Sequence, residues 1–97
     1  MIEAVPTVFI DNDQTRVTEW RFAPGAATGW HRHAMNYVVV PLMDGQLRIV
    51  GPDGEATIAE LKHGVPYYRD LGVEHDVINN NDYEFAFIEV EMKAAAS

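Results

Sequence analysis

Three of the four histidines of this chain occur in two short segments, at spacings that suit a metal ion. His31 and His33 are two positions apart, and alternate side chains of an extended strand point to the same face. They can therefore hold one ion together, while His75 must come from a strand that is distant in sequence. The chain has no cysteine, so the ligands available are imidazole, carboxylate, tyrosine and water. Imidazole ligands favour a divalent transition metal (Fe, Zn, Ni, Mn, Co or Cu) over magnesium or calcium.

A second interpretation of the same histidines is a pocket that keeps them without a metal. Two unliganded imidazoles inside an apolar barrel are costly, because burial disfavours their charged forms and their nitrogens need partners. The metal site is therefore the favoured interpretation. His63 precedes a predicted strand and is expected on the surface, outside the site.

Other side chains near these segments could take part in binding or catalysis. Tyr37 could donate its hydroxyl to a substrate oxygen or a metal-bound water, which makes it the candidate catalytic residue, or it could only fill core volume. Tyr67 and Arg69 are the candidate substrate-binding residues at the mouth of the site, together with Tyr68, and Arg69 could clamp a carboxylate. Glu89 is expected to be solvated or paired, although an inward Glu89 could supply a carboxylate ligand.

The elements that must position these side chains are predicted to be strands throughout. Period-two segments recur between turn signals, and no window has the apolar spacing of a helix. Pro41 interrupts a long apolar strand and predicts a bulge there. Nine short strands need two packed sheets or a barrel. The predicted strands are Thr7–Ile10, Arg16–Phe22, Thr28–His33, Asn36–Met43, Gln46–Val50, Glu55–Leu61, Pro66–Arg69, Asp76–Asn79 and Tyr83–Met92.

Length and charge narrow the classes of function. The 97 residues are expected to form a single domain, 1–97, whose last residues, 94–97, have nothing to pack against and should fray. The formal net charge of −8 opposes binding to nucleic acid, and the arginines are scattered. No apolar run is long enough to cross a bilayer, so no membrane partner and a cytoplasmic location are expected. Both faces of the last predicted strand carry apolar residues, so one of them is expected to cover a subunit interface.

Two spaced motifs in the chain resemble those of the cupin superfamily. The first motif runs from a glycine through His-x-His to a second glycine, and the second runs from a glycine through Gly-x-x-His to an asparagine. The matching residues are Gly25, His31, His33 and Gly45, then Gly64, Gly72, His75 and Asn79. The chain looks most like small bacterial cupins. The resemblance implies an all-β double-stranded β-helix, a jelly roll of two antiparallel sheets, and a homodimer.

The chain departs from the cupin pattern at the ligand position where most metal cupins have glutamate. That position falls on Tyr37 or Val38, and neither is a carboxylate. A three-histidine site leaves the ion its full charge, which favours an anionic ligand. It is similar in ligand set to cupin dioxygenases. Two functions remain open: a metal-dependent dioxygenase, isomerase or hydrolase acting on a small organic acid or carbonyl compound, and a small-molecule binding or sensing module in which the metal is structural or absent.

Overall fold

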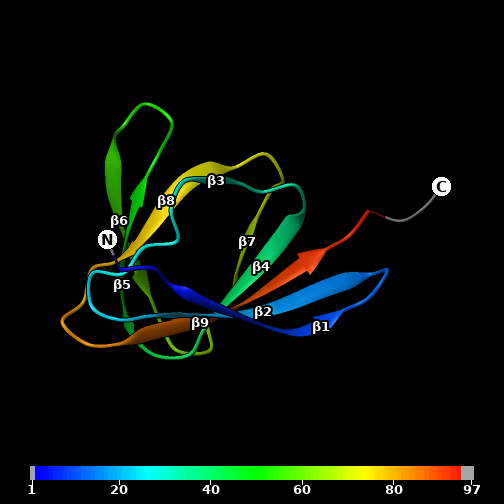
Figure 1. The fold of residues 1–97 in the computed structure, drawn as a ribbon, viewed down its shortest axis with the longest axis horizontal. Helices are drawn as coiled ribbons and strands as arrows, with labels where there is room; N and C mark the ends of the chain where they lie inside the picture. Colours follow the sequence, from blue (N-terminus) through cyan, green and yellow to red (C-terminus); the bar gives the residue numbers. More distant parts are fainter. Residues whose placement is uncertain (1, 95–97) are drawn as a thin grey trace.

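The computed structural model describes residues 2–94, which form nine strands in two antiparallel sheets (Figure 1). One sheet has the strand order β1 (Val5–Asp11), β2 (Thr15–Phe22), β9 (Phe85–Met92), β4 (Asn36–Pro41) and β7 (Tyr67–Arg69). The other has the order β3 (His31–Arg32), β8 (Glu74–Asn79), β5 (Gly45–Val50) and β6 (Ala56–Leu61). The predicted all-β jelly roll of two sheets is confirmed. Residues 2–94 contain no helix that could span a membrane.

Each predicted strand is present, with small changes at its ends. The largest change is in the predicted strand Thr28–His33, which is reduced to His31–Arg32. Gly29 has a φ of 83°, a left-handed conformation that breaks the extended backbone before His31. The predicted fraying end, 94–97, lies outside the described residues except for position 94.

The bulge predicted at Pro41 is wrong. β4 and β9 pair without interruption from Asn36 opposite Met92 to Pro41 opposite Phe87, and Pro41 is the last residue of β4. On its other edge β4 pairs with β7 only as far as Val39. Pro41 therefore lies beyond the end of the β7 ladder, where a missing amide hydrogen costs no ladder bond.

The core lies between the two sheets and is built from alternate residues of both. Phe22, Leu47 and Phe85 are its largest fully buried hydrophobic side chains. Gly45 approaches Phe85 so closely that a Cβ at position 45 would lie 2.7 Å from two atoms of the phenyl ring. Only glycine fits this position without displacing the ring.

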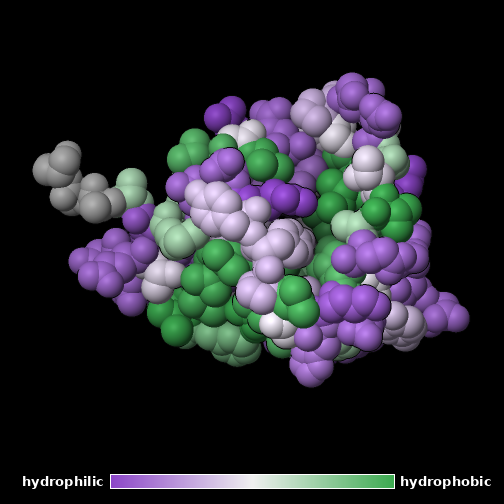
Figure 2. All heavy atoms as spheres, turned by 180° about the vertical axis from the view of Figure 1, so that it is seen from behind, coloured by the Kyte–Doolittle hydropathy of each residue, from purple (hydrophilic) through white to green (hydrophobic). Residues whose placement is uncertain are grey.

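The outer face of the five-stranded sheet carries an apolar patch on its three central strands, bordered on β2 by Glu19 and Arg21. Val17, Val90 and Val38 form one row across β2, β9 and β4, and Ile88 and Val40 lie together in the next. These side chains are half-buried, because they project away from the core. Figure 2, the view from behind, likewise shows hydrophobic residues reaching the surface between hydrophilic ones. Several large apolar side chains are thus left without full cover in the single chain.

Candidate metal centre

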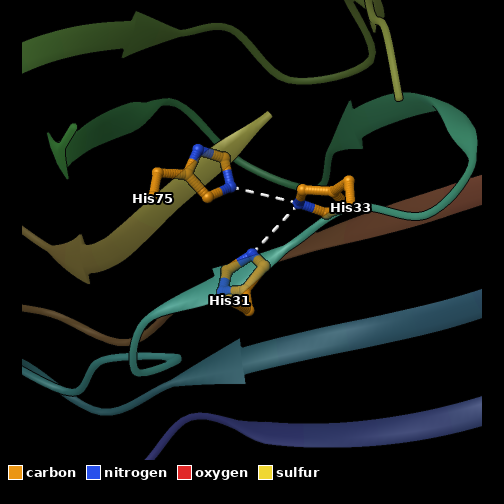
Figure 3. A group of neighbouring side chains, drawn as sticks. All are labelled: His31, His33 and His75. Carbon is orange, nitrogen blue, oxygen red and sulfur yellow. Dashed lines mark hydrogen bonds between the residues drawn. The ribbon is translucent and has the colours of Figure 1, made fainter. Parts of the chain in front are cut away.

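His31, His33 and His75 converge on one point between the sheets, as Figure 3 shows. His31 lies in β3 directly opposite His75 in β8, and His33 is the first residue after the end of β3. The Nε2 atom of His33 lies 3.0 Å from Nε2 of His31 and 3.1 Å from Nε2 of His75. His33 and His75 are buried and His31 is half-buried. The two segments that the sequence singled out are thus brought to one place.

The spacing of the three nitrogens agrees with that of ligands around a small cation. Metal–nitrogen bonds of about 2.0 to 2.1 Å place two nitrogens about 3.3 Å apart in tetrahedral geometry and about 2.9 Å apart in octahedral geometry. The two short distances here, 3.0 and 3.1 Å, lie in that range. The residues therefore fit a transition metal ion bound by three imidazoles.

Hydrogen bonds fix which nitrogen of His31 faces the centre. Nδ1 of His31 lies 2.9 Å from the carbonyl oxygen of Gly29, which can only accept a hydrogen bond. We therefore assign the proton of neutral His31 to Nδ1, and the lone pair of Nε2 points toward the other two histidines. Thr28 supports this carbonyl, because its hydroxyl donates to Gly29 O and accepts from the Val77 amide. Such outer-shell bonds commonly orient metal-binding histidines.

Burial keeps two of the three histidines neutral. Burial, and to a smaller extent the proximity of His31, lower the pKa of His33 to about 4. Burial also lowers the pKa of His75 to about 3, with smaller contributions from His31, His33 and Arg69. Metal binding requires deprotonated imidazole, so both residues are ready to bind at neutral pH without first losing a proton.

Tyr37, one of the two positions where the cupin glutamate could fall, is buried and contacts His33 through its ring. The two rings are stacked with their centroids 3.9 Å apart and an angle of 18° between planes. Tyr37 is only 2% exposed, and its hydroxyl is buried with no hydrogen-bond partner within residues 2–94. Burial, and next the charge of Glu89, raise the pKa of Tyr37, so the hydroxyl stays protonated. An unsatisfied buried hydroxyl costs free energy that a bound ligand would recover.

Glu89 and Glu91 are the site residues that the sequence interpretation underestimated. Both project inward from β9 and are 7% exposed, so the expectation of a solvated Glu89 is wrong. Glu91 is paired with Arg16, at 2.9 Å between Oε1 and Nε. Each has a ligand-type oxygen within 4.8 Å of a ring nitrogen of His33, but neither joins the three-histidine group. Burial, and next the charge of Glu91, raise the pKa of Glu89 to about 7, although a hydrogen bond from Trp20 and the charge of Arg16 act in the opposite direction.

These residues line a cavity of about 360 Å³ that opens between the sheets. The predicted residues Tyr67 and Arg69 are part of its wall, and the Arg69 guanidinium lies 5.0 Å from the centroid of the Tyr67 ring. Tyr68 is 50% exposed and faces away from the cavity, because neighbouring residues of β7 alternate. Trp20 also lines the cavity. His63 is exposed and lies outside it, as predicted.

The chain is similar to proteins of known structure and to one curated protein. The β-alanine degradation protein BauB of Pseudomonas aeruginosa is 55% identical over 91 residues, which are 94% of this chain and 95% of that protein. A cupin domain from Bordetella pertussis has 55% identity and a TM-score of 0.93, with 96% of each chain covered. A protein with a double-stranded β-helix domain from Klebsiella pneumoniae has 22% identity and a TM-score of 0.77, with 98% and 81% covered, and shows the fold alone. No protein-family model matches the chain.

The alignment with the curated protein extends over nearly the whole of both chains, so the likeness is that of the entire domain. The fold agrees with that of the two solved structures at both 55% and 22% identity. The chain therefore belongs to the cupin superfamily, in the family of the β-alanine degradation protein BauB.

Proposed function

We propose that this chain is a metal-dependent cupin that binds a divalent transition metal through His31, His33 and His75 and takes a small organic acid or carbonyl compound in the adjoining cavity. The observation that carries the proposal is that the buried Nε2 atom of His33 lies 3.0 Å from Nε2 of His31 and 3.1 Å from Nε2 of His75. The Gly29 carbonyl sets the tautomer of His31. When bound, the metal supplies a Lewis acid that polarises an oxygen of the ligand.

The remaining cavity residues have roles that follow from their chemistry. Tyr37 presents a protonated hydroxyl with no partner among residues 2–94, and this hydroxyl is available to hydrogen-bond with the ligand. Arg69 places a positive charge on the cavity wall, where it attracts an acid group, and Tyr67 supports the guanidinium through its ring. Walls that are mainly apolar with a few convergent polar groups are typical of small-molecule sites. The name of the relative BauB suggests β-alanine degradation as the metabolic setting of this chain.

Elemental analysis of protein purified without an affinity tag tests the metal site directly. We expect close to one transition metal ion per chain in the wild type and less than a tenth of that in His75→Ala. His63→Ala is the matched control, because His63 is exposed and outside the cavity, and it should retain the full metal content. Full metal content in folded His75→Ala would contradict the ligand assignment. A wild type that stays free of metal after anaerobic reconstitution with Fe²⁺ and Zn²⁺ would favour a metal-free binding module.

We also propose that two copies of the chain associate through the outer face of the five-stranded sheet. Val17, Val90 and Val38 form an apolar row across three strands, Ile88 and Val40 lie beside it on two of them, and all five side chains are only half-buried. Contiguous exposed apolar surface of this kind commonly marks a protein interface. The most frequent soluble assembly is a two-fold homodimer, in which the same patch meets itself.

A further inference from the structure

Two carboxylates lie inside the cavity, and of these only Glu91 forms an ion pair within residues 2–94. Glu91 accepts hydrogen bonds from Nε and Nη2 of Arg16, at 2.9 and 3.5 Å. Glu89 projects into the same cavity two residues earlier on β9, and within residues 2–94 it forms no ion pair. A side-chain hydrogen bond from Trp20 and the charge of Arg16 both lower the pKa of Glu89, but burial outweighs them, so the carboxylate is still costly to ionise without an ion pair. Glu89 therefore gains stability from a positively charged or hydrogen-bond-donating partner.

A buried hydroxyl without a hydrogen-bond partner lies near Glu89. The buried Tyr37 hydroxyl has no partner among the described residues, and of the charged groups that act on it Glu89 acts most strongly. β4 and β9 are paired, with Tyr37 opposite Glu91 and Val39 opposite Glu89, so Tyr37 and Glu89 are diagonal neighbours on the inner face. The phenolic oxygen and the carboxylate can both accept hydrogen bonds. A ligand group that carries several hydrogens satisfies both.

We propose that Glu89 and Tyr37 form a subsite for the protonated amino group of the ligand, so that the cavity selects small amino acids over acids that lack the amino group. The proposal rests on the proposed function, in which the acid end of the ligand lies at the metal centre and Arg69. The carboxylate oxygen of Glu89 lies within 4.8 Å of a ring nitrogen of His33. The two ends of the site are therefore close, and the ligand they serve is short, with about two or three carbons between its acid and amino groups.

The pair β-alanine and propionate tests this subsite, because the two acids differ only in the amino group. Their binding to the metal-loaded wild type is measured by calorimetry at pH 8, where the amino group of β-alanine is charged. We expect β-alanine to bind at least about tenfold tighter, since a buried hydrogen bond to a charged group contributes about that much. In Glu89→Gln the preference should fall to about threefold or less. Glu60→Gln changes an exposed strand glutamate outside the cavity and should keep the full preference.

The outcomes separate the subsite from the proposed function. If the wild type holds metal and binds both acids equally, or if folded Glu89→Gln keeps the preference, the subsite is wrong while the metal cupin stands. If neither acid binds to the metal-loaded protein, the acid-binding function fails as well. Two metal ions per chain in the wild type and one in Glu89→Gln would also overturn the subsite, because a second cation would then occupy its place. Circular dichroism of each variant establishes that it is folded.

Discussion

Replacing Glu89 by glutamine should stabilise the metal-free protein above neutral pH and leave it unchanged in acid. Glutamine has nearly the same size but does not ionise. The folded state raises the pKa of Glu89 from 4.5 to about 7, mainly through burial, so the folded form holds its proton more tightly than the unfolded form. The stability that protonated Glu89 contributes to the folded wild type is therefore fully present below pH 4.5. This stability is lost as the pH rises through the folded-state pKa of about 7.

The magnitude follows from the size of the shift. One pKa unit corresponds to about 1.4 kcal/mol, so a shift from 4.5 to about 7 corresponds to a penalty on the order of 3 kcal/mol in the wild type at pH 8. Glu89→Gln removes this penalty. With a urea dependence of about 1 kcal/mol per molar, the unfolding midpoint of the variant should be higher by about 2 to 3 M at pH 8. The two midpoints should converge near pH 4.5.

Urea unfolding at fixed protein concentration, in the presence of a chelator, measures this difference between pH 4.5 and 8. His33 and His75 act in the opposite direction, because their lowered pKa values make the folded state lose stability as the pH falls below 6.5. That effect is present in both proteins and cancels in the comparison. Glu60→Gln, at an exposed glutamate, should show no pH-dependent difference from the wild type. A difference for Glu89→Gln that is flat with pH, or that has the opposite sign, would refute the reasoning.

Three further predictions concern the cavity, the core and the outer sheet face. Tyr37→Phe should keep its metal ion and bind a small acid about three- to tenfold more weakly by calorimetry, since it loses one hydrogen bond; unchanged affinity would exclude the hydroxyl from binding. Gly45→Ala should lower the free energy of unfolding by about 1 to 3 kcal/mol, because its Cβ would lie 2.7 Å from a buried ring, whereas Gly51→Ala, with no atom closer than 3.5 Å, should not suffer this clash. Ile88→Glu should convert a dimer to a monomer in light scattering after gel filtration, while Ile58→Glu on the other sheet should not; a monomeric wild type would contradict the interface.

The strands could be predicted from the sequence because period-two alternation and turn residues are local signals. Each predicted strand is present in the structure. The strand at Thr28–His33 was overextended, because a positive φ at Gly29 is not encoded in the alternation. Pro41 was misread as a bulge, since the sequence does not reveal that the ladder on its free edge ends at Val39.

The sequence also identified the three histidines, because their spacing is a local property and the two motifs occur together. The sequence also indicated that Glu89 points inward. Phe85 and Phe87 face the core, and the same alternation continues to Glu89 and Glu91. The general exposure of glutamate outweighed that signal.

What the sequence by itself determined is the strand pattern, the two motif segments and the absence of a carboxylate at the usual ligand position. Only the tertiary structure decided which side chains meet, because contacts between β4, β8 and β9 depend on strand order and register and not on nearness in sequence. Pairing placed His75 opposite His31, set Tyr37 against His33, and left Glu89 in the cavity without an ion pair within residues 2–94. Burial in that shared interior, a property of two packed sheets and of no single strand, shifts the pKa values of these groups.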